Sequence, residues 1–467
     1  MGKRKYLFLG YMFLFFVGAS KSYSQHPNVL LIVADDMGLQ CSALNTPGVQ
    51  TPAIDYLIKH GTLTTKAYAT FPSCSPSRTS FLTGTFPHVN GVTTNVNELL
   101  EKEKGGKLGD NLSELNKQFA VNQNVTSLIE VLNRSGYYTG LTGKFHVSSP
   151  EKFPFDYWGK DVNASAFFKE AKKSGKPFFL DYNLHTPHRP YAKSPNDRSN
   201  IQLNSLEVPA YLPNNALMQQ DWSDYLGSVE ATDRAVADVM KLLADEGLEK
   251  NTLVIFIADH GPSIHRGKYS EYEFGSHVPI IFSGLNIPQG KINNSLFSLA
   301  DLMPTILDLL HLEVPTSVNG ASKKLNLLGD KQNLGKFIYT EVSLPRKGEP
   351  NFQGRGMSDG RYWYIRRNGK PRMPRYPADN FEAKVWGNLS YQATLNGKDD
   401  FPEQYHLLQI SENPPIEELF DLNNDPWSIK DLAKNADYKK ILKQMRKQMD
   451  QWIINTNDHE MMRTIKN

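Results

Sequence analysis

Cysteine is nearly absent from this chain of 467 residues, which contains only Cys41 and Cys74. A disulfide scaffold is therefore excluded, and any function of a cysteine has to be individual chemistry. The chain also lacks an excess of one charge, because 52 Lys and Arg stand against 49 Asp and Glu, a net charge of +3. This balance excludes the basic surface that is typical of nucleic-acid-binding proteins. Any anionic ligand must therefore be bound by local clusters of charge.

Internal repeats and low-complexity tracts are also missing. With 39% hydrophobic and 22% charged residues, the composition is that of an ordinary globular protein. The length predicts either one large domain with a smaller one, or two comparable domains.

The longest apolar run lies at the N-terminus. Within residues 1–24, Lys3, Arg4 and Lys5 precede an apolar run at 6–17, which small and polar residues follow. This pattern predicts a secretory signal peptide, because the run is shorter than the roughly 20 residues that span a bilayer. We therefore expect an exported protein, periplasmic or secreted, with no membrane anchor.

Apolar runs that stop at polar residues indicate buried parallel strands. Such runs lie at 29–34, 176–185 and 254–258, and helical spacing of apolar residues occurs between them at 126–135 and 224–246. Strands that alternate with helices predict an α/β fold, in which helices cover both faces of a sheet.

The composition changes after about residue 336. Strand-like runs at 336–342 and 361–367 precede a stretch rich in Gly, Pro, Arg and aromatic residues, and a helix is expected over 438–454. We therefore divide the mature chain into an α/β domain, residues 25–335, and a smaller C-terminal α+β subdomain, residues 336–467.

Aspartates follow two of the predicted strands. Asp35 and Asp36 end the first, and Asp259, followed by His260, ends the last. Because the carboxyl ends of parallel strands meet at one edge of a sheet, the three carboxylates should lie together and need a cation such as Ca²⁺ or Mg²⁺. His260 leaves zinc or manganese open, and each Asp alone would also suit a helix cap or a turn.

Cys74 lies in the segment FPSCSPSRTSFLTG, four residues before Arg78. If a helix begins there, Arg78 and the helix N-terminus lower the thiol pKa. Cys74 is then a candidate nucleophile with Arg78 as its anion partner. The alternative is a buried structural cysteine, which is what we expect of Cys41.

The string CSPSR at Cys74–Arg78, continued by LTG at 82–84, resembles the signature of the type I sulfatases. In that family a maturation enzyme oxidises the cysteine to formylglycine. The resemblance runs from about Asn28 to the C-terminal helix, and it implies an alkaline-phosphatase-like fold with a mixed, mostly parallel sheet. It also implies a formylglycine-generating enzyme as partner and one divalent cation, usually calcium. The implied metal ligands are Asp35, Asp36, Cys74, Asp259 and His260, of which the last is usually Asn in the family.

Three further elements resemble sulfatase motifs, namely GKFHV, LHTPHRP and HRGKYSEYEFGSHVP. The last of these has His277 where the family usually has Arg. The residues that these elements add to the implied site are Lys144, His146, His185, His188, Arg266 and Lys268.

The resemblance gives these residues roles. Arg78, Lys144 and Lys268 would supply positive charge to the sulfate oxygens, and His185 would protonate the leaving oxygen. His146 would contact the formylglycine hydroxyls. His188 and Arg266 are expected to contact the substrate.

The motifs, with WIINTND near the C-terminus, look most similar to heparan N-sulfatases and their bacterial relatives, some of which act on algal polysaccharides such as ulvan. We expect a sulfated carbohydrate as substrate, with an O-sulfate ester favoured over N-sulfoglucosamine. An aromatic and Arg-rich group either contacts sugars or packs the subdomain. Its members are Arg355, Arg375, Tyr376, Trp386 and Tyr391.

Three other classes stay open at this point. The first is a phosphate or phosphonate ester hydrolase of the same superfamily. The second is a sugar-binding relative without catalysis, and the third is a hydrolase that uses the unmodified thiol of Cys74.

Overall fold

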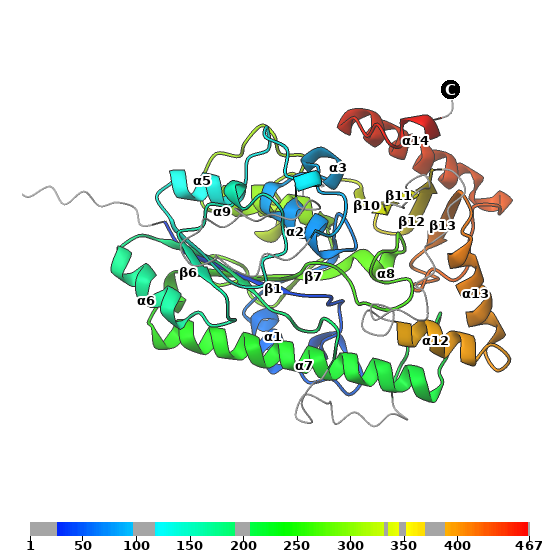
Figure 1. Cartoon of the computed structure of the whole chain (residues 1–467), viewed down its shortest axis with the longest axis horizontal. Helices are drawn as coiled ribbons and strands as arrows, with labels where there is room; N and C mark the ends of the chain where they lie inside the picture. Colours follow the sequence, from blue (N-terminus) through cyan, green and yellow to red (C-terminus); the bar gives the residue numbers. More distant parts are fainter. Residues whose placement is uncertain are drawn as a thin grey trace, which may run out of the picture.

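The computed structural model describes residues 26–96, 117–191, 206–330, 335–344, 352–368 and 388–465. The expected signal peptide at 1–24 lies outside these ranges. Within them, the strands form a nine-stranded sheet and a four-stranded sheet. Figure 1 shows the larger sheet between two groups of helices, with the smaller sheet and the C-terminal helices at one end of it.

The larger sheet is mostly parallel, as expected. Its strands are β1 (Asn28–Ala34), β2 (Gly61–Tyr68), β3 (Tyr138–Gly143), β4 (Tyr157–Gly159), β5 (Phe178–Asn183), β6 (Thr252–Ala258), β7 (His277–Ser283), β8 (Lys291–Asn293) and β9 (Phe297–Ser298). They lie in the order β4-β3-β5-β1-β6-β7-β2-β8, and β9 pairs with β2. Among the described strands of this sheet, β7 alone runs antiparallel to both of its neighbours, β6 and β2. The three apolar runs are confirmed as β1, β5 and β6, and every residue of these three strands is buried.

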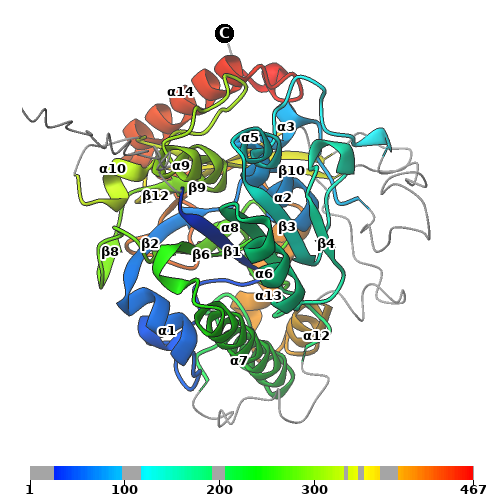
Figure 2. The same ribbon diagram turned by 90° about the vertical axis from the view of Figure 1, so that its left-hand side faces the viewer.

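Helices cover both faces of this sheet. They are α1 (Pro52–Lys59), α2 (Cys74–Thr83), α3 (Pro87–Asn90), α5 (Leu128–Arg134), α6 (Ser165–Ser174), α7 (Ala216–Asp245), α8 (Glu273–Ser276), α9 (Leu302–Leu309) and α10 (Lys324–Leu327). Figures 1 and 2 both show α1 and α7 on one side of the sheet and α5 and α9 on the other. The α/β fold is thus confirmed.

Both predicted helices exist with different starting points. The helix α5 begins at Leu128 instead of residue 126, because Ser127 caps it and its side chain accepts from the Glu130 amide in a capping box. The long helix α7 begins at Ala216 instead of Asp224, because Asn215 caps it and buried Met218 and Trp222 extend its apolar face toward the N-terminus.

The C-terminal part is built on the small antiparallel sheet. Its strands are β10 (Ile338–Leu344), β11 (Phe352–Ser358), β12 (Tyr362–Arg367) and β13 (Glu417–Asp421), and its helices are α12 (Asn388–Asn396), α13 (Pro402–Glu412) and α14 (Lys439–Thr456). The expected strands at β10 and β12 and the closing helix α14 are confirmed. The strand β11 was not predicted, because its sequence FQGRGMS lacks the β-branched residues that mark strands.

Arg355 on β11 does not contact sugars, because its side chain is completely buried. Its Nε donates to Asp458 Oδ2 at 2.8 Å and its Nη2 to Asp458 Oδ1 at 3.2 Å. Tyr391 likewise donates its hydroxyl to Glu412 at 2.8 Å. Packing is therefore the correct alternative for Arg355, whereas Tyr391 is half-buried and its contact with sugars stays a prediction. Arg375, Tyr376 and Trp386 lie outside the described residues.

No helix in the described ranges combines the length and the apolar character that crossing a bilayer would require.

The Arg355 pair generates a stability prediction. Asp458→Ala should lower the free energy of unfolding by about 3 kcal/mol, because it leaves a buried guanidinium without its main partner. Urea denaturation measures this change. In the control, Lys241→Ala breaks the exposed pair with Asp245 on α7 and should cost less than about 0.5 kcal/mol. Equal effects of the two substitutions would contradict the buried-pair interpretation.

Candidate active site

The helix α2 places Cys74 and Arg78 as the sequence predicts. Cys74 is the first residue of α2, after the extended N-cap Ser73, and all ten residues of the helix are buried. Arg78, one turn later, donates from Nε to Asp259 Oδ2 at 3.0 Å and from Nη1 to Asn183 Oδ1 at 2.6 Å. The helix therefore directs the thiol and the guanidinium toward the strand ends.

The three aspartates do meet at the edge of the sheet. Asp35 and Asp36 follow β1, and Asp259 follows the adjacent parallel strand β6, where Ala34 pairs with Ala258. Asp36 has a left-handed backbone with φ of 68°. Its amide donates to Asp259 Oδ1 at 3.1 Å, which fixes the two carboxylates relative to each other.

Two buried lysines approach Cys74 from different loops. The Lys144 ammonium, just after β3, lies 2.6 Å from Asp35 Oδ2 and 3.8 Å from Cys74 Sγ. The Lys268 ammonium lies 2.8 Å from Asp36 Oδ1 and 3.3 Å from Cys74 Sγ. Residue 74 thus lies beside two fixed positive charges.

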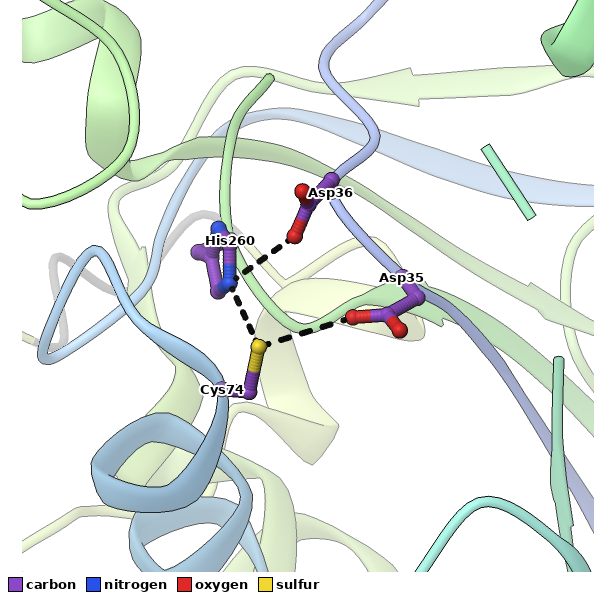
Figure 3. A group of neighbouring side chains, drawn as sticks. All are labelled: Asp35, Asp36, Cys74 and His260. Carbon is purple, nitrogen blue, oxygen red and sulfur yellow. Dashed lines mark hydrogen bonds and ion pairs between the residues drawn. The ribbon is translucent and has the colours of Figure 1, made fainter. Parts of the chain in front are cut away.

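His260 completes the group around the thiol. Figure 3 shows its ring beside Cys74 and Asp36. The Nε2 atom lies 3.3 Å from Cys74 Sγ and 3.2 Å from Asp36 Oδ1. Its Nδ1 lies 2.9 Å from the Gly261 carbonyl. A proton on Nδ1 would donate to that carbonyl and leave Nε2 as a metal ligand.

This group fits a divalent cation. Ligand atoms of Asp35, Asp36, Cys74 and His260 all lie within 4.8 Å of one another. Asp36 Oδ2 is buried and accepts no hydrogen bond from the described part of the chain, so it has free capacity for a metal. Asp259 is adjacent to this group but is not one of its four members. Its oxygens accept hydrogen bonds from Arg78 and from two backbone amides.

The charges shift the pKa values of the site. Burial raises the pKa of the Cys74 thiol, but Lys144 and Lys268 outweigh burial and lower it to about 6. Burial lowers the pKa of His260, and Asp259 and Asp36 more than reverse this effect and raise it to about 9. A cation at Nε2 would therefore replace a proton that the carboxylates stabilise.

The predicted histidines are placed differently from one another. His188 Nε2 lies 3.9 Å from Asp36 Oδ2, so His188 faces the candidate metal ligands. His185 is exposed just after β5. The Nε2 atom of His146 lies 2.5 Å from the Val96 carbonyl. The catalytic roles of His146 and His185 stay predictions.

Arg266 is engaged away from this group. It is only 4% exposed, and its guanidinium binds Ser411, the Ser428 carbonyl and the Tyr272 hydroxyl. These contacts connect Arg266 to the C-terminal subdomain, and they occupy the guanidinium that was expected to contact the substrate. His277 is also engaged elsewhere, since its ring bonds Glu273 and the Thr65 carbonyl.

Asn183 is a site residue that the sequence analysis missed. It is the last residue of β5 and accepts the hydrogen bond from Arg78. The signal was available, because Asn183 ends an apolar strand in the same way as Asp35 and Asp259 do.

The cluster generates a pH prediction for the unmodified protein without added metal. A pKa of about 6 means that Cys74 is mainly a thiolate above that pH, and the ultraviolet absorbance of the thiolate should rise in one step there. Lys144→Met should move the step upward by about one pH unit or more, because a positive charge is lost.

Cys41 serves as an internal control in this titration. Burial raises its pKa to about 12, so Cys74→Ser should abolish the step entirely. A step in the ordinary thiol range, at about pH 8.5, would show that the two lysines do not act on Cys74.

Comparisons with known proteins agree with this geometry. The family model described as Sulfatase matches residues 27–175 and 160–312. An ulvan-active sulfatase of Formosa agariphila is 25% identical over 93% of this chain and 76% of its own. The human N-sulphoglucosamine sulphohydrolase is 26% identical over 92% of this chain and 90% of its own.

A solved structure shows the same fold. It comes from work on the metabolism of multiple glycosaminoglycans by Bacteroides thetaiotaomicron, has a TM-score of 0.70 at 19% identity, and is matched over 93% of this chain and 97% of its own. The small antiparallel sheet after the large mixed one is therefore part of a known architecture. Because the family model covers more than half of the sequence, this chain belongs to the sulfatase family.

Proposed function

We propose that the protein hydrolyses sulfate esters on a sulfated polysaccharide or its oligosaccharides, with Cys74 converted to formylglycine and one divalent cation, preferably Ca²⁺. The observation that supports this most is the position of the Cys74 Sγ atom, 3.3 Å from the Lys268 ammonium and 3.3 Å from His260 Nε2. Residue 74 thus lies between a positive group and a candidate metal ligand.

Sulfate ester hydrolysis needs a nucleophile, positive charge at the sulfate oxygens and an acid for the leaving oxygen. Formylglycine at position 74 would supply a hydrated aldehyde, with one hydroxyl as the nucleophile for sulfur and the other available to release the sulfate by elimination. The cation would polarise sulfate oxygens as a Lewis acid, held by Asp35, Asp36 and His260 together with residue 74; Asp259, implied as a further ligand by the family resemblance, lies beside them.

The chain's own charges are prearranged for this reaction. Lys144, Lys268 and Arg78 are all buried and held by carboxylates. Because they are fixed in a buried site, they can stabilise developing negative charge without reorganising during the reaction. Burial lowers the pKa of Arg78 and of both lysines, but the neighbouring carboxylates outweigh burial and raise it, so all three stay charged.

We propose His185 as the acid for the leaving oxygen and His146 as the partner of the hydroxyls on residue 74. Exposure allows His185 to exchange protons with solvent. The Nε2 atom of His146 lies at the Val96 carbonyl, so Nδ1 would have to face residue 74. His188, beside Asp36, is proposed as a substrate contact.

For the substrate, we favour an O-sulfate ester of an algal polysaccharide such as ulvan. Two relatives named ulvan-active sulfatase are 25% and 27% identical to this chain, each over 93% of its length. N-sulfoglucosamine is the second candidate, because the human N-sulphoglucosamine sulphohydrolase has a comparable identity of 26% and is covered over 90% of its own length.

We also propose that the chain is exported through the signal pattern at residues 1–24 and meets a formylglycine-generating enzyme before it reaches its final compartment. The division of the mature chain at residue 336 is proposed on the change in composition, and the small sheet begins just after it, at Ile338.

Maturation is tested directly by mass spectrometry of protein from its native host. The tryptic peptide Ala67–Arg78 contains Cys74, and conversion should remove the sulfur and leave an aldehyde. Cys74→Ser serves as the unmodified control for peptide assignment. An intact thiol in active protein would reject the formylglycine mechanism and favour a hydrolase that uses the thiol.

Substrate choice is tested by the release of inorganic sulfate from matured protein. We expect release from ulvan oligosaccharides and at least about tenfold lower kcat/KM for N-sulfoglucosamine, a difference of about 1.4 kcal/mol in transition-state stabilisation. Lys268→Ala, which removes a charge beside residue 74, should lower release from either substrate. The opposite preference would assign the protein to the N-sulfoglucosamine class.

A further inference from the structure

The segment 259–272 leads from β6 toward α8 and carries Lys268 to the site. Lys268 is flanked by two residues with left-handed backbone, Arg266 with φ of 60° and Tyr269 with φ of 63°. This conformation is unfavourable for residues that carry a Cβ atom, and it persists where surrounding contacts fix it. The position of the Lys268 ammonium therefore depends on what holds the two sides of the segment.

On the upstream side, Arg266 ties the segment to the C-terminal part of the chain. Its Nη1 donates to the Ser428 carbonyl at 2.8 Å, its Nε to Ser411 Oγ at 3.2 Å and its Nη2 to the Tyr272 hydroxyl at 3.4 Å. The guanidinium also lies 4.1 Å from the centre of the Tyr272 ring. Ser411 belongs to α13, and Ser428 follows β13.

On the downstream side, side chains of β12 and β13 form hydrogen bonds with the end of the segment. Arg367 Nε donates to Glu271 Oε1 at 3.1 Å, and Trp363 Nε1 donates to the Glu271 carbonyl at 2.9 Å. Glu418 accepts from Arg367 Nη1 at 2.6 Å and from the Tyr272 hydroxyl at 3.1 Å. All of these residues are buried.

On the catalytic side, the segment is held by the backbone. The Tyr269 amide donates to the Pro72 carbonyl at 2.7 Å, and the Lys268 amide donates to the Pro262 carbonyl at 2.9 Å. Pro72 lies two residues before Cys74, so the Lys268 turn rests directly on the segment that leads into α2. The side-chain anchors of Arg266 and Glu271 hold the segment on either side of that turn.

We infer that Arg266 is a positioning residue that acts on sulfate ester hydrolysis through Lys268, so that the C-terminal subdomain completes the active site. This inference rests on the proposed function and deepens it. Arg266 is suited to this role instead of substrate binding, because each of its three guanidinium nitrogens already has a partner within the protein.

The test is a double-mutant cycle on full-length matured protein, with kcat/KM measured by sulfate release from ulvan oligosaccharides or, if these are not hydrolysed, from N-sulfoglucosamine. Lys268→Ala should lower kcat/KM by about a hundredfold and Arg266→Gln by about tenfold. The double variant should match Lys268→Ala within about twofold, because an effect that passes through Lys268 disappears with it. A general loss of folded enzyme would not show this pattern.

Two further variants keep the test decisive. Ser411→Ala removes one of the anchors without touching a charge, and it should give a smaller loss that Lys268→Ala also abolishes. Arg361→Gln is the control for loss of an arginine, since Arg361, just before β12, forms a half-exposed pair with Asp421 on β13 outside this network and should leave kcat/KM unchanged.

Independent, additive losses in the double variant would overturn the inference and assign Arg266 to a separate role in binding or folding. Wild-type kcat/KM in Lys268→Ala would overturn both the inference and the proposed role of Lys268. Matured wild-type protein that releases no sulfate from either substrate would reject the proposed function itself, whatever the variants show.

Discussion

Three carboxylates that face three cations, all buried around one cysteine, form the interaction on which the site depends. Asp35 faces Lys144 at 2.6 Å, Asp36 faces Lys268 at 2.8 Å, and Asp259 faces Arg78 at 3.0 Å. Charges removed from water are costly unless each has a partner with good geometry. The positions of the strand ends, α2 and the two lysine loops therefore depend on one another. A bound cation would further stabilise the ionised form of the carboxylates.

The parts of this arrangement that depend on short sequence distances were predictable. Apolar strands that end in aspartate predicted the edge where Asp35, Asp36 and Asp259 meet, and the one-turn spacing predicted that Cys74 and Arg78 share a helix start. These inferences work because strand direction and helix period fix where neighbouring side chains point.

Contacts between distant segments were not predictable from spacing. The Arg266 partner Ser411 lies 145 residues further along the chain, and Arg355 is separated from Asp458 by 103 residues. An arginine in a segment rich in glycine and aromatic residues looks the same whether it binds a sugar or a buried carboxylate. Only the three-dimensional packing shows that both arginines face inward.

The antiparallel strand β7 has a consequence for how such sites can be altered. The chain leaves β6 at the edge where the carboxylates lie and, because β7 runs the other way, it enters β7 at that same edge. The intervening segment never crosses the sheet, so in protein engineering it is a natural unit for exchange between relatives without any change in strand pairing. Its backbone conformation, however, is partly fixed by contacts with β12 and β13. An exchange of this segment would therefore have to include the residues of those two strands that contact it.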